Sequence, residues 1–228
     1  MSAWAIVAAA GEGSRLGDGP KAFIPLGGSP MLAHSLVAFA KSSVEGIVVV
    51  VPAGLEDDAR AAAAAAVPSA RVEVVSGGST RQASVRNGLA ALPTGADRVV
   101  VHDAARPLVT VAMIEAALAA LGGAPGAVVA VGERDTLKRA DGDRVAETVP
   151  RSGLFRAQTP QAFRTDVLRA AHDRAAEEGF EATDDAMLLE RIGERVAIVP
   201  GDERNVKVTT RDDLALAEAL LAAASGGT

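Results

Sequence analysis

Two cationic side chains flank a glycine-rich loop near the start of the chain. Arg15 and Lys21 stand six residues apart in the loop of residues 11–21, which follows a short apolar run. Glycines allow backbone N–H groups to approach a phosphate, and Arg and Lys side chains can grip its charge. The loop lacks the G-K-[ST] sequence of a Walker loop, and Leu16 replaces the third glycine of a dinucleotide fingerprint. The loop therefore favours a polyphosphate site of another kind; the alternative is a glycine-rich turn with solvated charges.

A second loop, residues 76–85, also combines glycines with hydroxyl side chains after an apolar run. The carboxyl ends of strands are where open α/β sheets bind ligands, so this loop is a candidate for the same site. The alternative is that Ser79 or Thr80 only caps the start of a helix.

Asp103 and Arg106 lie in a third loop, which follows the apolar run of residues 99–101. A carboxylate at a strand end with an arginine three residues later offers a magnesium ligand and a phosphate clamp. The alternative is an Asp103–Arg106 ion pair that only braces the loop. Lys207, in an apolar setting near the end of the chain, is either a third cation directed at this pocket or a surface lysine.

The composition excludes several other classes of protein. The 228 residues include no cysteine, and the three scattered histidines lack the spacing of zinc ligands. The net charge of −6 disfavours binding along a nucleic-acid backbone and favours a small anionic ligand. The opening apolar run of residues 3–10 is too short to span a bilayer, and no other apolar run approaches the roughly 18 residues required. We therefore expect a cytoplasmic protein that binds neither nucleic acid nor membranes.

The three loops need a scaffold that brings them to one edge, and the apolar pattern predicts one. Short β-branched runs without polar alternation indicate strands that are buried on both faces. They occupy residues 6–7, 47–51, 72–75, 99–101, 128–131 and 196–199. Apolar residues repeat at helical spacing between them, as in Leu32, Leu36 and Phe39, in Val85, Leu89 and Leu92, and in Met113, Ala117 and Leu121. The pattern predicts a single α/β domain over residues 1–228, with a mostly parallel sheet covered by helices.

Residues 132–149 interrupt this alternation. Asp141 and Gly142 separate two strand-capable runs, which predicts a β-hairpin at about residues 133–150. The hairpin carries many charges and few apolar side chains, and such a hairpin is not stable alone. Either it lies on the parent domain, or it projects and is held by a second subunit.

Taken in chain order, these loops resemble the 2-C-methyl-D-erythritol 4-phosphate cytidylyltransferase family. The resemblance covers nearly the whole chain, and the Asp-Ala-Ala-Arg-Pro and Thr-Pro-Gln blocks are its most specific parts. The matching segments are residues 9–11 with Gly13, Arg15 and 20–21; 77–78 with Arg81 and 84–85; 102–107; 135–138; Arg151 with 153–154; 159–161; and 206–209 leading to 213–217. Two positions depart from the pattern. Ala8 stands where many relatives have proline, and Arg204 stands where some carry an acid considered to lie near the metal, which leaves Asp103 as the one predicted metal ligand.

The resemblance implies a Rossmann-like nucleotidyltransferase fold with a projecting hairpin arm, and it implies a role for each matched residue. CTP would be held by Ala9, Ala10, Gly11, Gly13, Gly78, Ser79 and Ser84. Arg15, Lys21 and Lys207 would surround the triphosphate as the catalytic cations, and Asp103 would bind Mg²⁺ and contact the second substrate. Methylerythritol phosphate would be bound by Arg106, Thr159, Thr136 and Arg151. Thr136 and Arg151 would act in the partner's site, in a homodimer with shared active sites.

The implied reaction transfers CMP from CTP to 2-C-methyl-D-erythritol 4-phosphate and releases pyrophosphate, in the non-mevalonate isoprenoid pathway. The attacking phosphate is already ionised near neutral pH, since its second pKa is about 6, so no general base is required. This agrees with the lack of a Ser-His-Asp or Cys-His arrangement in the sequence. Two alternatives stay open: a cytidylyltransferase for another polyol phosphate such as ribitol 5-phosphate, and a non-catalytic nucleotide-binding module.

Overall fold

The structure is a computed structural model that describes residues 1–11 and 19–225. A seven-stranded sheet forms its centre, in the order β11-β7-β10-β6-β1-β4-β5. These strands span Ser2–Ala8 (β1), Gly46–Val51 (β4), Val72–Ser76 (β5), Ala96–Asp103 (β6), Gly126–Gly132 (β7), Phe155–Arg164 (β10) and Val196–Pro200 (β11). All neighbouring pairs are parallel except those of β10, which runs antiparallel to both β6 and β7. The prediction of a mostly parallel sheet is confirmed, and each predicted strand lies within an observed one.

The sequence pattern does not predict β10. The buried half of this strand contains Gln158, Thr159 and Gln161, each less than 7% exposed, together with a proline. Polar side chains and proline usually argue against an inner strand. Here the polar groups find partners inside the protein, because Gln158 donates to the carbonyl of Asp202 at 2.8 Å and Gln161 donates to the carboxylate of Asp184 at 2.8 Å. The strand therefore combines a place in the core with hydrogen bonds to two distant loops.

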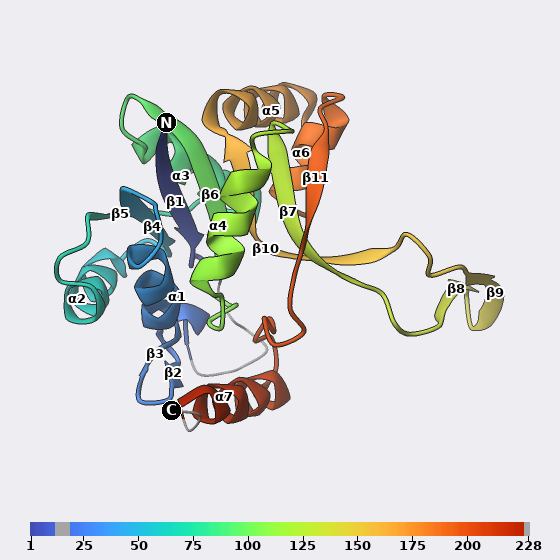
Figure 1. Ribbon diagram of the computed structural model, residues 1–228, viewed down its shortest axis with the longest axis horizontal. Coiled ribbons are helices and arrows are strands. Elements are labelled where there is room, and N and C mark those ends of the chain that lie inside the picture. The colour runs from blue at the N-terminus through green and yellow to red at the C-terminus, as the bar shows by residue number, and fades with distance from the viewer. Residues whose placement is uncertain (12–18, 226–228) are drawn as a thin grey trace.

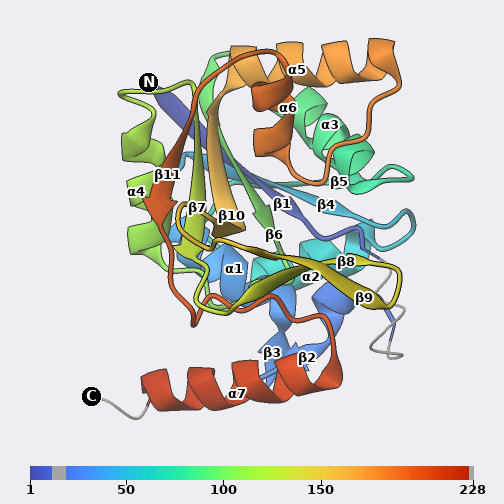
Figure 2. The same ribbon diagram turned by 90° about the vertical axis from the view of Figure 1, so that its right-hand side faces the viewer.

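Helices cover both faces of the sheet, as Figures 1 and 2 show. One face is packed by α1 (Met31–Ala40), α2 (Glu56–Ala66) and α4 (Val111–Ala120), and the other by α3 (Arg81–Ala91), α5 (Thr165–Glu178) and α6 (Asp185–Arg191). The predicted stripe Leu32, Leu36 and Phe39 is fully buried on α1. Residues Val48 to Val50 of β4 contribute alternately to both cores, which accounts for their uninterrupted β-branched sequence.

A smaller apolar cluster lies below the sheet. It joins Ile24, Leu26 and Met31 to the last helix, α7 (Arg211–Ser225), through Ala217. Residues 21–30 form the short elements η1 (Lys21–Phe23), β2 (Pro25–Leu26) and β3 (Ser29–Pro30), and Figure 2 shows β2 and β3 beside α7. Thr210 caps α7 by accepting from the N–H of Asp213. None of the described helices combines the length and the hydropathy needed to cross a membrane.

The predicted hairpin is present as a separate two-stranded sheet, β8 (Leu137–Asp141) paired with β9 (Arg144–Val149). Gly142 forms its turn at φ 61°, a left-handed conformation that glycine adopts without strain. Figure 1 shows this arm extending away from the central sheet on the strands β7 and β10. Val145 is 64% exposed and Phe155, at the base of the arm, is 48% exposed. Of the two alternatives for the hairpin, the one in which it lies on the parent domain is wrong.

Candidate active site

A polar cavity of about 560 Å³ opens at the carboxyl ends of β1 and β6. Parallel strands bring the loops that follow them to the same edge of the sheet, which explains why segments far apart in sequence meet here. Nine of the predicted site residues line the cavity: Ala9, Ala10, Gly11, Lys21, Gly78, Ser79, Ser84, Asp103 and Lys207. Gly13 and Arg15 lie outside the described residues.

The second glycine loop is held in place by the start of α3. Thr80 is the N-cap, since its hydroxyl accepts from the N–H of Ala83 at 3.1 Å; the choice between Ser79 and Thr80 is thereby decided. Ser84, only 2% exposed, accepts from the N–H of Gly78 at 3.1 Å and donates to the carbonyl of Thr80 at 2.9 Å. Gly78 and Ser79 are left exposed to the cavity. The loop thus offers open backbone N–H and C=O groups to a nucleotide in the cavity.

Glycine is also required for this loop to approach the first one. A Cβ placed on Gly77 would lie 2.5 Å from the Cβ of Ala10 and 2.9 Å from the hydroxyl oxygen of Ser84. Such distances are too short for any larger residue unless the backbone moves. Gly77 therefore lets the first and second loops form one continuous wall of the cavity.

Asp103 is the charged centre of the cavity. Its carboxylate accepts from Arg81 Nε at 3.0 Å and from Lys207 Nζ at 2.7 Å. Burial alone would raise the pKa of Asp103, but the two cations outweigh burial and hold that pKa well below its usual value. The side chain is therefore ionised at neutral pH, and Lys207 is directed into the cavity by an ion pair.

The alternative of an Asp103–Arg106 ion pair is wrong, because within the described part of the chain the carboxylate is paired with Arg81 and Lys207. Arg106 instead donates to the carbonyls of Asn205 at 2.7 Å and Ala157 at 3.3 Å. Burial lowers the pKa of this guanidinium. Its contacts fasten the loop after β6 to the loop before α7 and to β10.

Thr159 is only 4% exposed, and its hydroxyl is engaged within the protein. It accepts from the N–H of Asp103 at 3.1 Å and lies 3.0 Å from Nδ1 of His102. Burial lowers the pKa of His102 to about 4, so the ring is neutral at pH 7. Because Nε2 of the ring lies 3.1 Å from the carbonyl of Arg106, we assign the proton to Nε2, and Thr159 then donates to Nδ1. His102 and Thr159 thus fix the backbone on which Asp103 stands.

Thr136 and Arg151 are exposed and belong to the arm. The guanidinium of Arg151 donates to the carbonyl of Arg134, at the base of the arm. Neither residue lines the cavity of its own chain in the described structure, and Figure 1 shows the arm directed away from the sheet.

The donor set at Asp103 fits a divalent cation. Each carboxylate oxygen accepts one hydrogen bond, whereas a carboxylate offers about four lone-pair sites, so acceptor capacity remains. The described residues contain no group of three or more His, Asp or Glu that could hold a metal. A metal at Asp103 would take its other ligands from phosphate oxygens and water, as Mg²⁺ commonly does.

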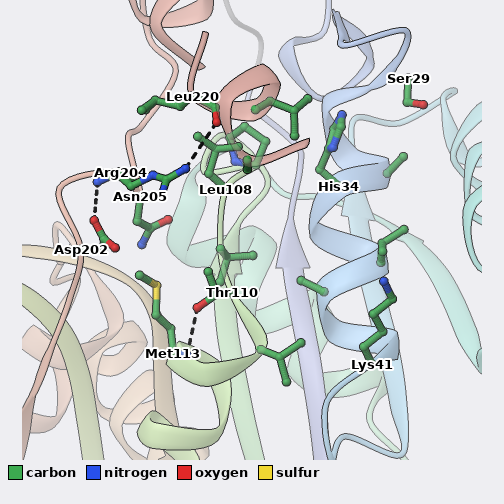
Figure 3. A pocket seen from close by; sticks show the side chains of 18 of the residues that line it. Ser29, His34, Lys41, Leu108, Thr110, Met113, Asp202, Arg204, Asn205 and Leu220 are labelled. Atoms are coloured by element: carbon green, nitrogen blue, oxygen red, sulfur yellow. Dashed lines mark hydrogen bonds between the residues drawn. The ribbon is translucent and has the colours of Figure 1, made fainter. Parts of the chain in front are cut away.

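A second cavity, of about 700 Å³, lies between α1, α4 and α7 (Figure 3). Its walls are largely apolar, with Leu108 and Met113 among the side chains that face it, and Lys41 stands at one end. The site of a polyphosphate is expected to combine open backbone N–H groups with several cations. The polar cavity beside Asp103 meets that description and the larger cavity does not.

Two features of the site are not predicted from the sequence. The sequence gives Arg81 no role beyond matching the family, yet its side chain donates to Asp103. Asp185, which accepts from the same guanidinium, is not predicted at all. Asp185 lies 104 positions from Arg81 along the chain. No local spacing could have signalled that contact.

An open α/β sheet with a cationic, glycine-lined cavity at its strand ends defines a nucleotide-binding protein of the doubly wound class. The family of 2-C-methyl-D-erythritol 4-phosphate cytidylyltransferases matches residues 3–223. The protein of that name from Cereibacter sphaeroides (strain KD131) is 50% identical over 229 residues, covering 99% of this chain and all of the relative. The one from Deinococcus radiodurans is 48% identical and covers 98% of this chain and 91% of the relative. The chain belongs to this family.

Solved structures of this family have the same fold as this chain. The crystal structure of 2-C-methyl-D-erythritol 4-phosphate cytidylyltransferase from Thermus thermophilus has a TM-score of 0.81 at 36% identity, over 96% of this chain and 98% of that one. The 4-diphosphocytidyl-2C-methyl-D-erythritol synthase from Anaerococcus prevotii has a TM-score of 0.84 at 29% identity, over 97% and 98%. The implied fold is therefore confirmed.

Proposed function

We infer that this chain transfers CMP from CTP to 2-C-methyl-D-erythritol 4-phosphate, releasing pyrophosphate, as an enzyme of isoprenoid biosynthesis. The observation that carries the inference is the cavity at the ends of β1 and β6, where two glycine loops face Lys21, Lys207 and Asp103 in a chain that belongs to the family throughout its length. We assign the activity to the cytoplasm, where CTP is available.

CTP occupies the cavity along the two glycine loops. The backbone of Ala9, Ala10, Gly11 and Gly78, with Ser79 and Ser84, lines the side on which the nucleotide lies, and Gly13 extends the first loop. Lys21 and Lys207, which line the cavity, bind the triphosphate. Arg15, which lies outside the described residues, is proposed as the third cation from its place in the first loop.

The reaction is an in-line displacement at the α-phosphorus. An ionised oxygen of the second substrate's phosphate attacks, the bond to the pyrophosphate oxygen breaks, and negative charge builds on the equatorial oxygens. Fixed cations stabilise that charge, at about 3–4 kcal/mol for each well-placed donor. The attacking group needs no base, because its second pKa is about 6. The neutral, buried His102 is accordingly a structural residue.

Asp103 holds a divalent metal, which we propose is Mg²⁺. When bound, the metal neutralises part of the charge on the phosphates. The ionised carboxylate and its free acceptor sites support this assignment. Lys207 donates to Oδ2 of Asp103 at 2.7 Å and would contact the phosphates beside that metal.

The second substrate binds beside Arg106 and Thr159, and the partner subunit completes its site. We propose a homodimer in which Thr136 and Arg151 of each arm enter the other subunit's cavity. Support comes from the arm itself, whose exposed apolar side chains and projecting path leave both residues outside their own chain's cavity.

The substrate assignment is tested by pyrophosphate release with CTP, UTP, ATP and GTP against a panel of polyol phosphates. Turnover with CTP and 2-C-methyl-D-erythritol 4-phosphate is expected to exceed every other pair. Faster turnover with ribitol 5-phosphate would assign the chain to another cytidylyltransferase reaction, and binding of CTP without turnover on any acceptor would make it a non-catalytic module.

The shared site is tested by subunit complementation between Arg151→Ala and Lys21→Ala. Each variant alone is expected to be inactive. In a mixed dimer one site receives both defects and the other receives neither, so an equal mixture should recover about a quarter of wild-type activity. Mass spectrometry confirms that mixed dimers have formed, and mixed dimers without recovered activity would show that Arg151 does not serve the partner's site.

A further inference from the structure

Asp185 is a buried carboxylate that the proposed reaction does not use. It is the first residue of α6 and is 1% exposed. Its Oδ2 accepts from Arg81 Nη1 at 2.7 Å, and its Oδ1 lies 3.4 Å from Nε2 of the buried His172. Burying an ionised carboxylate costs free energy unless the carboxylate is paired, and Arg81 supplies that pairing. The question is what this buried ion pair does for the cavity.

Arg81 joins this carboxylate to the cavity. Its guanidinium donates through Nη1 to Asp185 and through Nε to Asp103, and Asp103 receives Lys207 on its other oxygen. Four alternating charges therefore run from the core to the cavity. The side-chain exposure is 1% at Asp185, 29% at Arg81, 11% at Asp103 and 46% at Lys207.

The geometry fixes the direction of the carboxylate at Asp103. Arginine is a long side chain with many rotamers, so a single contact would leave it mobile. With Nη1 bound to Asp185, the guanidinium donates to Asp103 through Nε, and its buried Nη2 has no hydrogen-bond partner among the described residues. That single bond on Oδ1 leaves Oδ2 for Lys207. Without Asp185, Arg81 could bind both oxygens of Asp103 or turn toward the phosphates.

We propose that Asp185 is a positioning residue for cytidylyl transfer, which acts through Arg81 to orient Asp103 and Lys207. This proposal rests on the proposed function. It predicts that removing the charge of Asp185 impairs the transition state more than it impairs CTP binding, since the cations stay in the cavity but lose their arrangement.

The test is steady-state kinetics of Asp185→Asn, with Asp184→Ala as the matched control. Asp184 is the adjacent acid and caps α6 by accepting from the N–H of Met187 at 3.0 Å, but its carboxylate does not bind Arg81. We expect kcat of Asp185→Asn to fall by about 10- to 100-fold, as for other residues that orient a ligand of the reacting groups. KM for CTP should stay within about threefold of the wild type. The control should lower the melting temperature while kcat is kept.

A double-variant cycle distinguishes positioning from a general structural role. If Asp185 acts through Arg81, then Asp185→Asn combined with Arg81→Ala should be no slower than Arg81→Ala alone. Losses in kcat that multiply would overturn the proposal. Calorimetry of CTP binding in the presence of EDTA gives a second readout, in which the affinity of Asp185→Asn should equal that of the wild type.

Arg81→Lys keeps the test decisive if Asp185→Asn does not fold. A lysine keeps the charge, but its compact ammonium cannot span both carboxylates as the guanidinium does. It should reproduce the loss in kcat, and wild-type kcat in this variant would overturn the proposal. A wild-type enzyme that is inactive on the whole substrate panel would instead refute the proposed function.

Discussion

Replacing Asp103 by asparagine removes the charge at the centre of the site with little change in shape. The carboxylate makes two charge-assisted hydrogen bonds, to Arg81 at 3.0 Å and to Lys207 at 2.7 Å. Arg81 keeps its second partner, Asp185, so its charge is not left unpaired in the core. The variant should therefore fold.

The magnitude follows from the exposure of the two partners. The bond to the largely buried Arg81 contributes about 1.5–3 kcal/mol. The Lys207 side chain is 46% exposed, so solvent screening reduces its share to roughly 0–1 kcal/mol. The free energy of unfolding should fall by about 1.5–4 kcal/mol in total. Asp173→Asn is the matched control, because its ion pair with Arg86 is exposed on both sides and should cost less than about 1 kcal/mol.

The kinetic effect of Asp103→Asn should appear in turnover. The charges of Asp185, Arg81, Asp103 and Lys207 sum to zero in the wild type and to +1 in the variant, so binding of the CTP polyanion should not weaken. We expect kcat to fall by about 100-fold or more because a metal ligand is lost and Lys207 is no longer directed. The assay is pyrophosphate release over a magnesium titration. Unchanged kcat over that titration would refute the assignment of Asp103 and leave it as a structural partner of Arg81 and Lys207.

Two further predictions concern the lysines of the cavity and the buried His102. Lys21→Ala and Lys207→Ala should each lower kcat more than they raise KM for CTP, since charge at the α-phosphate peaks in the transition state; variants that change only KM would contradict this. His102 should make stability depend on pH: burial lowers its pKa from 6.5 to about 4, so the unfolded chain binds the proton first as the pH falls. The stabilisation is complete above pH 6.5 and is lost toward pH 4, by up to about 3 kcal/mol. Urea unfolding of wild type and His102→Gln at pH 7.5 and 5 measures it, and equal pH dependence in the two would be the contrary result.

The sequence predicts the parts of the fold that depend on local pattern. Runs such as residues 47–51 read as buried strands because every position is apolar, and the observed β4 is buried at each of them. The apolar pattern does not predict β10, because its buried residues include the polar Gln158, Thr159 and Gln161. Hydrogen bonds to distant residues, such as those of Gln158 and Gln161, make this burial possible. Periodicity reports apolar burial, and it carries no information on polar burial.

In the candidate site, too, features set by local sequence can be predicted and features set by tertiary packing cannot. Glycine loops and strand-end cations can be predicted, since the carboxyl ends of parallel strands meet wherever such a sheet forms. The pairing of Asp103 could not be, because its nearest cation in sequence, Arg106, binds backbone carbonyls while Arg81 and Lys207 arrive from other loops. Sequence distance favours the wrong partner, and only the tertiary packing that brings these loops together decides the right one.

The topology of the sheet explains how an arm can complete a second subunit's site. β10 is antiparallel to both β6 and β7, so β6 and β7 run the same way and end at the same edge. The arm leaves at the carboxyl end of β7 and returns into the start of β10, and it therefore departs from the edge at which the cavity opens. In a two-fold dimer built on that edge, each arm that crosses to its partner meets the partner's cavity edge. This topology supports the proposed shared site, because Arg151 stands at the base of an arm that leaves the sheet at the edge where the cavity opens.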